Sequence, residues 1–318
     1  MIPTLVLTAG LGTRLDPLTR LLAKPAVPVA GVPLGARVLQ WLAHEGITDA
    51  VLNLHHLPHT VTGAIGDGAA LGLRVRYSWE PTVLGSAGGP RHALPLLFHE
   101  PISELADAVG RHPMLIVNGD TLTEAALAPL VADHVKHGAD VTLLVVPNTA
   151  PDRYNGIAAT NGVVTRFIPK GHTESSWHFV GVQVVNANVF ASLPDNTPAE
   201  SVSGIYRHLL ATRPGPLRIF QANATFHDVG TPEDYRRMCV AFGGTDTHGN
   251  VVWPGAAIEV GAQLHDCVVT GGTHVPAGLA ARGAVLVPKI LMRPADRCRV
   301  VGNIAIFERT SLHLSANG

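Results

Sequence analysis

Residues 9–25 read Ala-Gly-Leu-Gly-Thr-Arg-Leu-Asp-Pro-Leu-Thr-Arg-Leu-Leu-Ala-Lys-Pro, and they follow directly on the apolar run Leu5-Val6-Leu7. The apolar run predicts a buried strand, and the two glycines behind it allow a tight turn and a close approach of the backbone to a ligand. Arg14 follows this turn, and Lys24 comes ten residues later. Free backbone N–H groups together with two fixed cations are what a polyphosphate requires. The stretch therefore predicts a phosphate-binding turn at the end of the first strand.

Strand-like and helix-like segments alternate through the first half of the chain. Apolar runs predict strands at residues 5–8, 50–54, 73–78, 114–117 and 141–146. Apolar residues at helical spacing predict one helix from Leu34 to a stop at Gly46, and another from Leu127 to a stop at Gly138. This alternation is typical of an α/β fold with a Rossmann-like, mostly parallel sheet covered by helices. Ligands of such sheets bind beyond the carboxyl ends of the strands, where the turn at 9–14 falls.

The second half begins with a strand-rich region and then changes character. We expect strands within 156–168, at 178–185 and at 217–222, and helices near 201–211 and 232–242. A turn-rich stretch at 243–247 follows and is interpreted as a linker. The chain is therefore expected to form two domains, a catalytic domain at 1–243 and a C-terminal domain at 249–318.

Beyond the linker, small and apolar residues recur every six positions. With one slip of a single position, the repeat runs through Val252, Ile258, Leu264, Val269, Val275, Ala281 and Val287. A hexapeptide period predicts a short left-handed β-helix, and a Gly- and Ala-rich loop tail is the alternative. So short a coil leaves apolar surface uncovered, which favours a homo-oligomer, with a dimer as the commonest form. Ending the chain after residue 243 is expected to leave the chemistry largely intact.

Composition narrows the class of protein. Of the 318 residues, 46% are apolar and only 15% charged, and the formal net charge is −1. No general basic face is present to attract nucleic acid, and no apolar stretch approaches the ~18 residues that span a bilayer. Three cysteines without metal-like spacing fit a reducing compartment. We expect a cytoplasmic protein that binds neither nucleic acid nor membrane.

The string at 9–25 resembles the signature of the sugar-1-phosphate nucleotidyltransferases, also called nucleotide-sugar pyrophosphorylases. It differs from the P-loop, which places Gly-Lys-Ser/Thr at a helix start. Further matches follow in the family's order over roughly the first 240 residues, at 80–89, 118–120, Gly156, 179–181 and 228–232. The resemblance implies that a nucleoside triphosphate and a sugar-1-phosphate are joined to a nucleotide sugar, with release of pyrophosphate.

Two aspartates are the expected metal ligands. Asp120 follows the apolar run at 114–117, and Asp228 precedes a Gly-Thr-Pro helix start. In the resembled family, the matching aspartates hold Mg²⁺ between the nucleotide and the sugar phosphate. Carboxylate oxygens suit Mg²⁺, which takes few protein ligands and keeps its waters. A turn residue or a helix cap is the alternative for either aspartate alone.

Three cations are the expected catalytic residues. The resemblance implies that Arg14 contacts the leaving phosphates and that Lys24 contacts the transferring region. Lys170 lies where the family commonly reads Glu-Lys-Pro, whereas this chain has Pro169-Lys170-Gly171. We expect Lys170 to meet the sugar phosphate, with an exposed loop lysine as the alternative. The acidic residue that often contacts sugar hydroxyls is missing, so the sugar cannot be read from this motif.

Nucleoside and sugar contacts are expected from backbone-rich positions. The resemblance places them at Ala9, Gly10, Gly12, Thr13, Glu80, Gly85, Gly156 and Gly181. Asn118 is expected either to touch the ligand or to position Asp120. The stretch at 84–89 is taken as a loop in which glycines permit close approach to base and ribose. His55, His56 and His59 lack the spacing of a metal site and are interpreted as ordinary loop residues.

Base and sugar are not fixed by these motifs, because base discrimination depends on a few hydrogen bonds, many of them to the backbone. The run at 53–57, the stretch at 84–89 and the C-terminal repeats are most similar to mannose-1-phosphate guanylyltransferases. Uridylyltransferases acting on N-acetylmuramic acid 1-phosphate are similar in the catalytic half. A non-catalytic regulatory subunit that binds a nucleotide sugar is a further alternative, as is an acyltransferase using His265 or His274.

Overall fold

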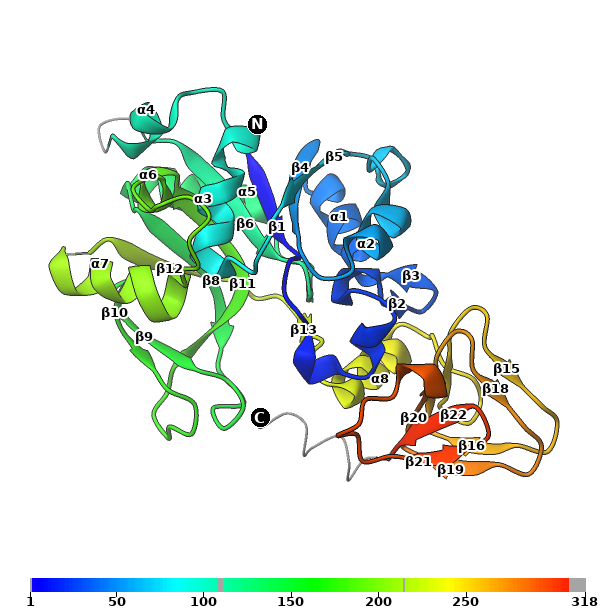
Figure 1. Ribbon diagram of the computed structural model, residues 1–318. Coiled ribbons are helices and arrows are strands. Elements are labelled where there is room, and N and C mark those ends of the chain that lie inside the picture. The colour runs from blue at the N-terminus through cyan, green and yellow to red at the C-terminus, as the bar shows by residue number, and fades with distance from the viewer. Residues whose placement is uncertain (1, 108–110, 214, 309–318) are drawn as a thin grey trace. The chain divides into compact units, whose positions relative to one another are not determined.

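The computed structural model describes residues 2–107, 111–213 and 215–308 (Figure 1). These form two compact units. The sheet unit comprises Met1–Gly10, Val38–His56 and Gly66–Phe226, and the signature-and-coil unit comprises Leu11–Arg37, Leu57–Ile65 and His227–Gly318. The segment with the phosphate-binding signature therefore groups with the C-terminal part of the chain. The two domains expected from the sequence divide the chain at other positions, and they stay a prediction. Residues 309–318 of the second expected domain lie outside the described residues.

A nine-stranded sheet forms the centre of the sheet unit, in the order β5-β4-β1-β6-β11-β8-β12-β10-β9. Its strands are β1 (Thr4–Leu7), β4 (Asp49–Leu54), β5 (Arg74–Trp79), β6 (Pro113–Asn118), β8 (Val141–Pro147), β9 (Gly156–Thr160), β10 (Val163–Ile168), β11 (Trp177–Asn186) and β12 (Leu217–Gln221). All strands expected from apolar runs are present, with ends shifted by a residue or two. Their side chains form the core, where Leu5, Ile116 and Val145 are fully buried.

The expectation of a mostly parallel sheet is wrong, because the sheet is mixed. β5, β4, β1 and β6 pair in parallel, as do β8 and β12. β11 runs antiparallel to both β6 and β8, and β10 runs antiparallel to β12 and β9. The turn Asn161-Gly162 alone connects β9 to β10, and so short a connection can join only antiparallel strands.

Helices accompany the strands, and those expected near 34–46, 127–138, 201–211 and 232–242 are all present. They are α1 (Leu34–His44), α2 (Pro58–Ile65), α3 (Gly85–Leu97), α4 (Ile102–Ala106), α5 (Leu127–His137), α6 (Asn188–Ala191), α7 (Tyr206–Thr212) and α8 (Pro232–Ala241). α3 packs on β1, β4 and β5, and α5 packs on β8, β11 and β12. Gly138 ends α5 in the left-handed conformation, with φ of 58°, as its sequence position predicted. Among the described helices, none has the length and apolar character needed to cross a bilayer.

The C-terminal coil, residues 251–307, consists of short strands in the signature-and-coil unit. They are β14 (Val251–Val252), β15 (Ala257–Ile258), β16 (Gln263–His265), β17 (Val268–Val269), β18 (His274–Val275), β19 (Ala280–Arg282), β20 (Val285–Pro288), β21 (Arg299–Val301) and β22 (Ile304–Phe307). Three parallel ladders join β14 to β17 and β20, β15 to β18, and β16 to β19. The register repeats every 17 residues, since Val251 pairs with Val268 and Val268 with Val285.

This register confirms most of the six-residue spacing and corrects one position, Val287. Val269 and Val275 are fully buried inside the coil. Val252 and Ile258 stack on them but are 42% and 37% exposed, because β14 is the edge strand of its sheet and β15 has only β18 as a partner. In the third turn, Leu286 stacks on Val269, so it takes the place expected for Val287. β22 pairs antiparallel with β20 and β21, which ends the repeat.

Candidate active site

In the sheet unit, several predicted site residues gather where β1 and β6 end. Leu7 of β1 lies opposite Asn118 of β6, so Ala9 and Gly10 leave the sheet beside Asp120. The Gly119 N–H donates to the carbonyl oxygen of Leu7 at 2.9 Å. A Cβ on Gly119 would come within 2.6 Å of the Thr8 methyl group. The two turns can therefore approach this closely only because residue 119 is glycine.

Asn118 and Gly181 are also brought together. Val182 pairs with Val117 across β11 and β6, and the pairing of β11 with β8 shifts register in this region. Gly181 has φ of 82°, and a Cβ there would lie 2.6 Å from Asn118 Nδ2. The Asn118 amide thus packs on the bare backbone of Gly181, and a larger residue at 181 would displace it.

Behind the Ala9 turn lies a buried polar network that the sequence analysis missed in part. Asn53 Oδ1 accepts from the backbone N–H groups of Thr8 at 2.6 Å and Ala9 at 3.3 Å. Asn53 Nδ2 donates to Glu80 Oε1 at 2.7 Å, and Glu80 Oε2 accepts from Leu84 N at 2.9 Å. Glu80 is 1% exposed. Both of its oxygens thus hold protein groups in place, and a nucleoside contact from Glu80 stays a prediction.

Asn53 is the residue that links this network to the turn. It is a polar residue inside the apolar strand β4, where the side chain is 3% exposed. Buried amides need hydrogen-bond partners, so a lone Asn in an apolar run is a signal that could have identified it.

The stretch at 84–89 is the first part of α3, which corrects its interpretation as a loop. Gly85 and Gly88 face the segment 197–200, where a Cβ on Gly85 would lie 2.7 Å from the carbonyl oxygen of Ala199. The same carbonyl accepts from the N–H groups of Ala87 and Gly88. The glycines suggested an irregular backbone, but here they permit close packing of a helix against an extended segment. A nucleoside contact at Gly85 stays a prediction.

Gly156 and Lys170 lie at neighbouring ends of β9 and β10. Gly156 pairs with Ile168, two residues before Lys170, and the Lys170 N–H donates to Asn155 Oδ1 at 2.9 Å. The Lys170 side chain is exposed. A Cβ on Gly156 would lie 2.7 Å from His172 Nε2, which shows that this loop folds back over the strand.

Two of the histidines that were interpreted as loop residues, His55 and His59, lie in different units. His55 Nδ1 lies 2.9 Å from the Glu80 carbonyl oxygen in the loop after β4. His59 belongs to α2 in the other unit, so its interpretation as a loop residue is wrong. The proline at position 58, which pre-sets helical φ at a first position, was the missed signal.

The signature-and-coil unit contains three other predicted residues, Arg14, Lys24 and Asp228. Gly12 has φ of 63°, and a Cβ there would lie 2.8 Å from the Thr19 methyl group and 3.5 Å from Lys24 Cβ. This folds the signature into a compact turn with Thr13, Arg14 and Lys24 on it. The exposed Arg14 guanidinium lies beside Gly230, where a Cβ would come within 3.4 Å of Nη1. Arg14 therefore reaches the loop that follows Asp228.

That loop is fixed by the start of α8. Thr231 is the N-cap, and its hydroxyl accepts from the Asp234 N–H at 3.2 Å while Asp234 Oδ2 accepts from the Thr231 N–H at 3.0 Å. Such a capping box satisfies donors at the helix end and sets the angle at which the chain enters. Asp228 is thus placed a few residues before a rigid helix start.

Asp120 and Asp228 fit a Mg²⁺ ion by the chemistry of their oxygens. Mg²⁺ is bound by one or two carboxylates together with substrate phosphates and water, so it needs no dedicated cage. Across residues 2–107, 111–213 and 215–308, no three His, Cys, Asp or Glu side chains are grouped as metal ligands. Each of the two aspartates thus suits a metal that arrives with its substrate.

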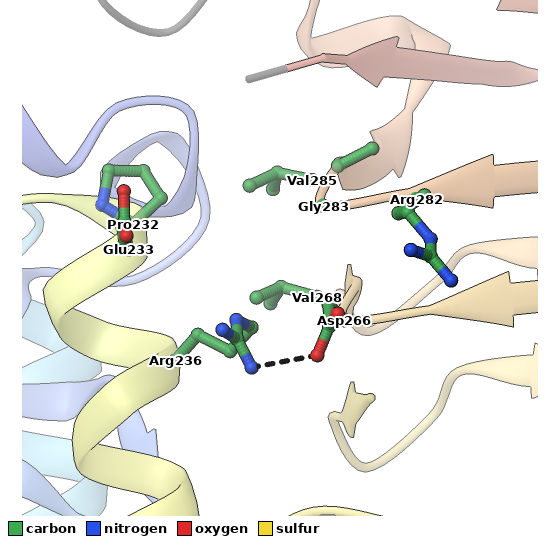
Figure 2. A pocket seen from close by; sticks show the side chains of 9 residues that line it. Pro232, Glu233, Arg236, Asp266, Val268, Arg282, Gly283 and Val285 are labelled. Atoms are coloured by element: carbon green, nitrogen blue, oxygen red, sulfur yellow. Dashed lines mark hydrogen bonds and ion pairs between the residues drawn. The ribbon is translucent and has the colours of Figure 1, made fainter. Parts of the chain in front are cut away.

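A separate hollow of about 330 Å³ opens between α8 and the coil, within the signature-and-coil unit (Figure 2). Arg236 of α8 and Asp266 of the coil form an ion pair there, with Nη1 and Oδ1 3.0 Å apart. None of the predicted site residues lines this hollow. It ties α8 to the coil at a place distinct from the signature.

The nucleotidyl transferase family model matches residues 3–242. A mannose-1-phosphate guanylyltransferase of Mycobacterium tuberculosis is 28% identical over 306 residues, covering 87% of this chain and 82% of the relative. An N-acetylmuramate alpha-1-phosphate uridylyltransferase of Neisseria meningitidis serogroup B is 41% identical over 121 residues, covering 38% of this chain and 47% of that one.

Among solved structures, HddC from Yersinia pseudotuberculosis complexed with GMP-PN matches with a TM-score of 0.63 at 21% identity. The match covers 76% of this chain and 100% of that chain. At this identity the likeness concerns the fold, which is the mixed α/β architecture described above.

Proposed function

The chain belongs to the nucleotidyl transferase family and is an enzyme of the sugar-1-phosphate nucleotidyltransferase type, and we propose that its substrates are GTP and mannose 1-phosphate. The products would be GDP-mannose and pyrophosphate, which makes it an enzyme of nucleotide-sugar biosynthesis. The observation that supports the proposal is the position of Arg14 beside Gly230, two residues after the expected metal ligand Asp228. The choice of substrates follows the M. tuberculosis relative, which is similar over most of both chains.

The reaction is an in-line displacement at phosphorus. A phosphate oxygen of the sugar-1-phosphate forms a bond to the α-phosphorus, and the bond from that phosphorus to the α,β-bridging oxygen breaks. The electron pair of the broken bond leaves with pyrophosphate. Because the nucleophile is already an anion, no general base is required, and the barrier comes from repulsion between anions and from charge that develops on the phosphates.

Fixed cations would lower this barrier. We assign Arg14 to the leaving β- and γ-phosphates, Lys24 to the transferring phosphate and Lys170 to the sugar phosphate. A Mg²⁺ ion held by Asp120 and Asp228 would neutralise phosphate charge and help to orient the substrates. The turns at Ala9, Gly10, Gly12 and Thr13 would face the nucleotide, and Asn118, Gly156 and Gly181 would border the sugar.

An assay of pyrophosphate release tests the proposal directly. The protein is incubated with Mg²⁺, each of the four common nucleoside triphosphates and a panel of sugar-1-phosphates. We expect the highest kcat/KM with GTP and mannose 1-phosphate. No release with any combination would contradict the reaction itself, whereas a preference for another pair would contradict only the substrate assignment.

Uridylyl transfer to an N-acetyl amino sugar 1-phosphate is the second candidate. The higher identity to the Neisseria enzyme, 41% over 121 residues, favours it, but the match covers only 38% of this chain. UTP in side-by-side turnover with GTP distinguishes the two. A non-catalytic regulatory subunit is disfavoured because Arg14, Lys24, Asp120 and Asp228 are all present.

We also propose that the C-terminal coil is a short left-handed β-helix and that two chains form a dimer through it. Its first turn exposes Val252 and Ile258, and Val260 nearby is 99% exposed. Apolar side chains gathered at an uncovered coil end favour burial by a second chain. Light scattering at micromolar concentration is expected to give the mass of a dimer, and a strictly monomeric mass would contradict this.

A further inference from the structure

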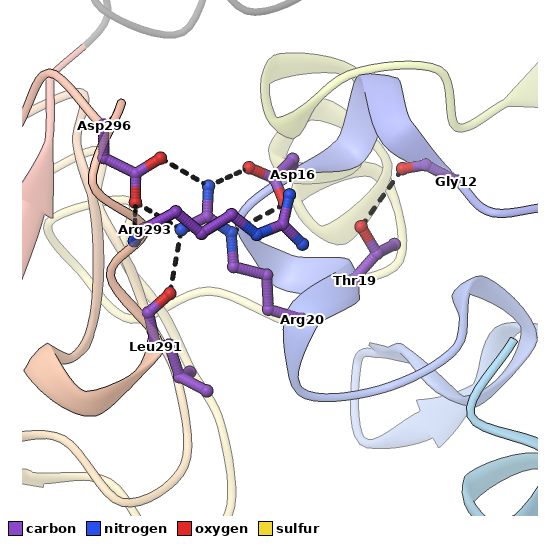
Figure 3. Close-up of polar contacts among 7 residues, drawn as sticks. All are labelled: Gly12, Asp16, Thr19, Arg20, Leu291, Arg293 and Asp296. Carbon is purple, nitrogen blue, oxygen red and sulfur yellow. Dashed lines mark hydrogen bonds and ion pairs between the residues drawn. The ribbon is translucent and has the colours of Figure 1, made fainter.

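Every N–H donor of the Arg20 side chain makes a hydrogen bond (Figure 3). Nε and Nη2 donate to the two oxygens of Asp16, with Nε at 2.8 Å from Oδ1. Nη1 and Nη2 donate to the two oxygens of Asp296, with Nη2 at 2.8 Å from Oδ1. Nη1 also donates to the Leu291 carbonyl oxygen at 2.9 Å. The five N–H groups of the guanidinium thus have five acceptors, and the side chain is only 6% exposed.

The acceptors come from two distant parts of the chain. Asp16 belongs to the phosphate-binding signature itself, whereas Leu291 and Asp296 lie in the connection between β20 and β21 of the coil. Arg20 also lies over the ring of Phe307, with Cζ 5.2 Å from the centroid. Asp296 is itself fixed, because its Oδ2 accepts from the Arg293 N–H at 2.7 Å. We call Arg20, Asp16 and Asp296 the clamp.

The clamp sits directly against the turn that bears Arg14. Arg20 ends the short helix Leu18–Arg20, and its neighbour Thr19 donates from Oγ1 to the Gly12 carbonyl oxygen at 3.1 Å. The Thr19 methyl group also fills the space beside Gly12. A displacement of Arg20 therefore moves Thr19, and through it the Gly12 turn.

A second contact ties the same segment to the coil. Trp253 Nε1 donates to the Tyr235 hydroxyl at 2.8 Å, and that hydroxyl donates to the Pro28 carbonyl oxygen. Tyr235 and Trp253 are buried. The segment Leu11–Arg37 is thus held at Arg20 and at Pro28 by groups from the C-terminal part of the chain, which agrees with its place in that compact unit.

We propose that Arg20 is a positioning residue for nucleotidyl transfer, through which the β20–β21 connection of the coil holds the Gly12–Arg14 turn in its phosphate-binding position. The inference rests on the proposed function for its kinetic readout alone. It gives the coil a role in the reaction that the sequence analysis did not expect.

Asp296→Asn tests the clamp with little change of shape. It removes the coil's charge on Arg20 while Asp16 remains in place. Asp266→Asn is the matched control, because it weakens another aspartate–arginine contact between the coil and the rest of the unit, at Arg236, without touching the signature. Arg20→Lys keeps the charge but has three N–H donors on one nitrogen in place of five on a planar fork, so it cannot make all five hydrogen bonds.

Two readouts are compared. Amide hydrogen exchange is expected to increase in peptides covering residues 11–26 of Asp296→Asn and Arg20→Lys, with exchange in β6 unchanged. The kcat is expected to fall roughly ten- to a hundredfold in both, with the KM for the sugar-1-phosphate nearly unchanged, because misplacement of a positioned group lowers rate more than binding. Asp266→Asn is expected to change neither.

Wild-type exchange at 11–26 together with an undiminished kcat in Asp296→Asn would overturn the proposal, as would equal effects from Asp266→Asn. Failure of the proposed function is recognised separately, since a wild-type protein without turnover would leave the exchange experiment to decide on the clamp. Increased exchange with full kcat would show a tie without a role in positioning, and would also overturn it.

Discussion

The sheet unit and the signature-and-coil unit place their site residues in different ways. In the sheet unit, Ala9 and Asp120 come directly after regular strands, and hydrogen bonds of Asn53 and Glu80 fix the turns close to the strand ends. In the other unit, Arg14 and Lys24 stand on short 3₁₀ turns with few hydrogen bonds of their own. There, the backbone depends on side chains from far along the chain, above all on the clamp. A sheet orients the residues at its strand ends, whereas an irregular segment must be held from outside.

The largest expected effect is the loss of kcat when Asp120 or Asp228, one aspartate from each unit, is neutralised. If each unit supplies one metal ligand, Asp120→Asn and Asp228→Asn should each lower kcat on the order of a thousandfold, since a bound metal contributes several kcal/mol to the transition state. Pyrophosphate release under saturating Mg²⁺ measures this, with circular dichroism to check the fold. Asp67→Asn, an exposed aspartate of the sheet unit, is the control. A near-normal rate in either variant would assign the metal to one unit alone.

Removal of the coil tests whether the irregular segment needs outside support. A chain that ends after residue 243 lacks Asp296, Leu291 and Trp253 together, so the signature loses the clamp, and Tyr235, which holds Pro28, loses its hydrogen-bond donor. We expect turnover to fall about a hundredfold. The strands of the sheet unit should persist by circular dichroism. Full turnover in the shortened chain would restore the expectation drawn from the sequence and reduce the clamp to a tie for stability.

Substitution of Glu80 tests how much the buried hydrogen-bond network contributes to the stability of the sheet unit. Glu80→Ala removes the acceptors of Asn53 Nδ2 and Leu84 N in a buried place, and each unsatisfied donor costs about 1–3 kcal/mol. Urea unfolding should therefore show a loss of roughly 2–5 kcal/mol. Glu200→Ala is the control, because Glu200 accepts from Ser86 at the same helix but is exposed, and its loss should stay below about 1 kcal/mol. Equal losses of unfolding free energy in the two variants would mean that burial does not determine how much this network stabilises the fold.

The division between the units also explains which elements the sequence predicts. Strands β1, β4, β6 and β8 are apolar runs whose burial can be read from composition alone, so they and the residues at their ends were found. The parallel order could not be extended to β9–β12, because pairing direction depends on connection length and on which strand becomes the neighbour. The glycines of α3 indicated a loop, since the partner segment 197–200 that requires them is more than a hundred residues away.

The same distinction between local signals and long-range contacts applies to the site residues. Ala9, Asn118, Asp120 and Gly181 come together because adjacent strands bring them together. Arg20 and Asp296 could not be paired from the sequence, since 276 positions separate them and Asp296 belongs to no motif that the sequence analysis recognised. Long-range polar contacts leave no periodic trace in a sequence, whereas strand ends do.

The smallest expected effect is a dependence of stability on pH that belongs to the sheet unit. His134 on α5 is 2% exposed, between the Thr142 hydroxyl and the Asn186 amide oxygen. Burial lowers the pKa of His134, an effect that its hydrogen bond to Asn186 only partly offsets. The unfolded chain binds this proton with a pKa of about 6.5, so it holds more protons than the folded chain just below that value. The free energy of unfolding should therefore decrease as the pH falls below about 6.5.

The contribution of the clamp to stability is also lost as the pH falls, but only at a much lower pH. The hydrogen bond from Arg20 lowers the pKa of Asp296, so its contribution is present above the unfolded value of about 3.9 and is lost only as the pH falls through the lower folded value. Between pH 8 and 5.5, acid should thus weaken the sheet unit through His134 and leave the clamp intact. Urea unfolding of wild type and His134→Gln across this range measures the difference, since glutamine keeps polar atoms beside Thr142 and Asn186 but does not titrate. Parallel pH profiles would contradict the assignment, because a buried neutral histidine must cost stability when the unfolded chain can take up its proton.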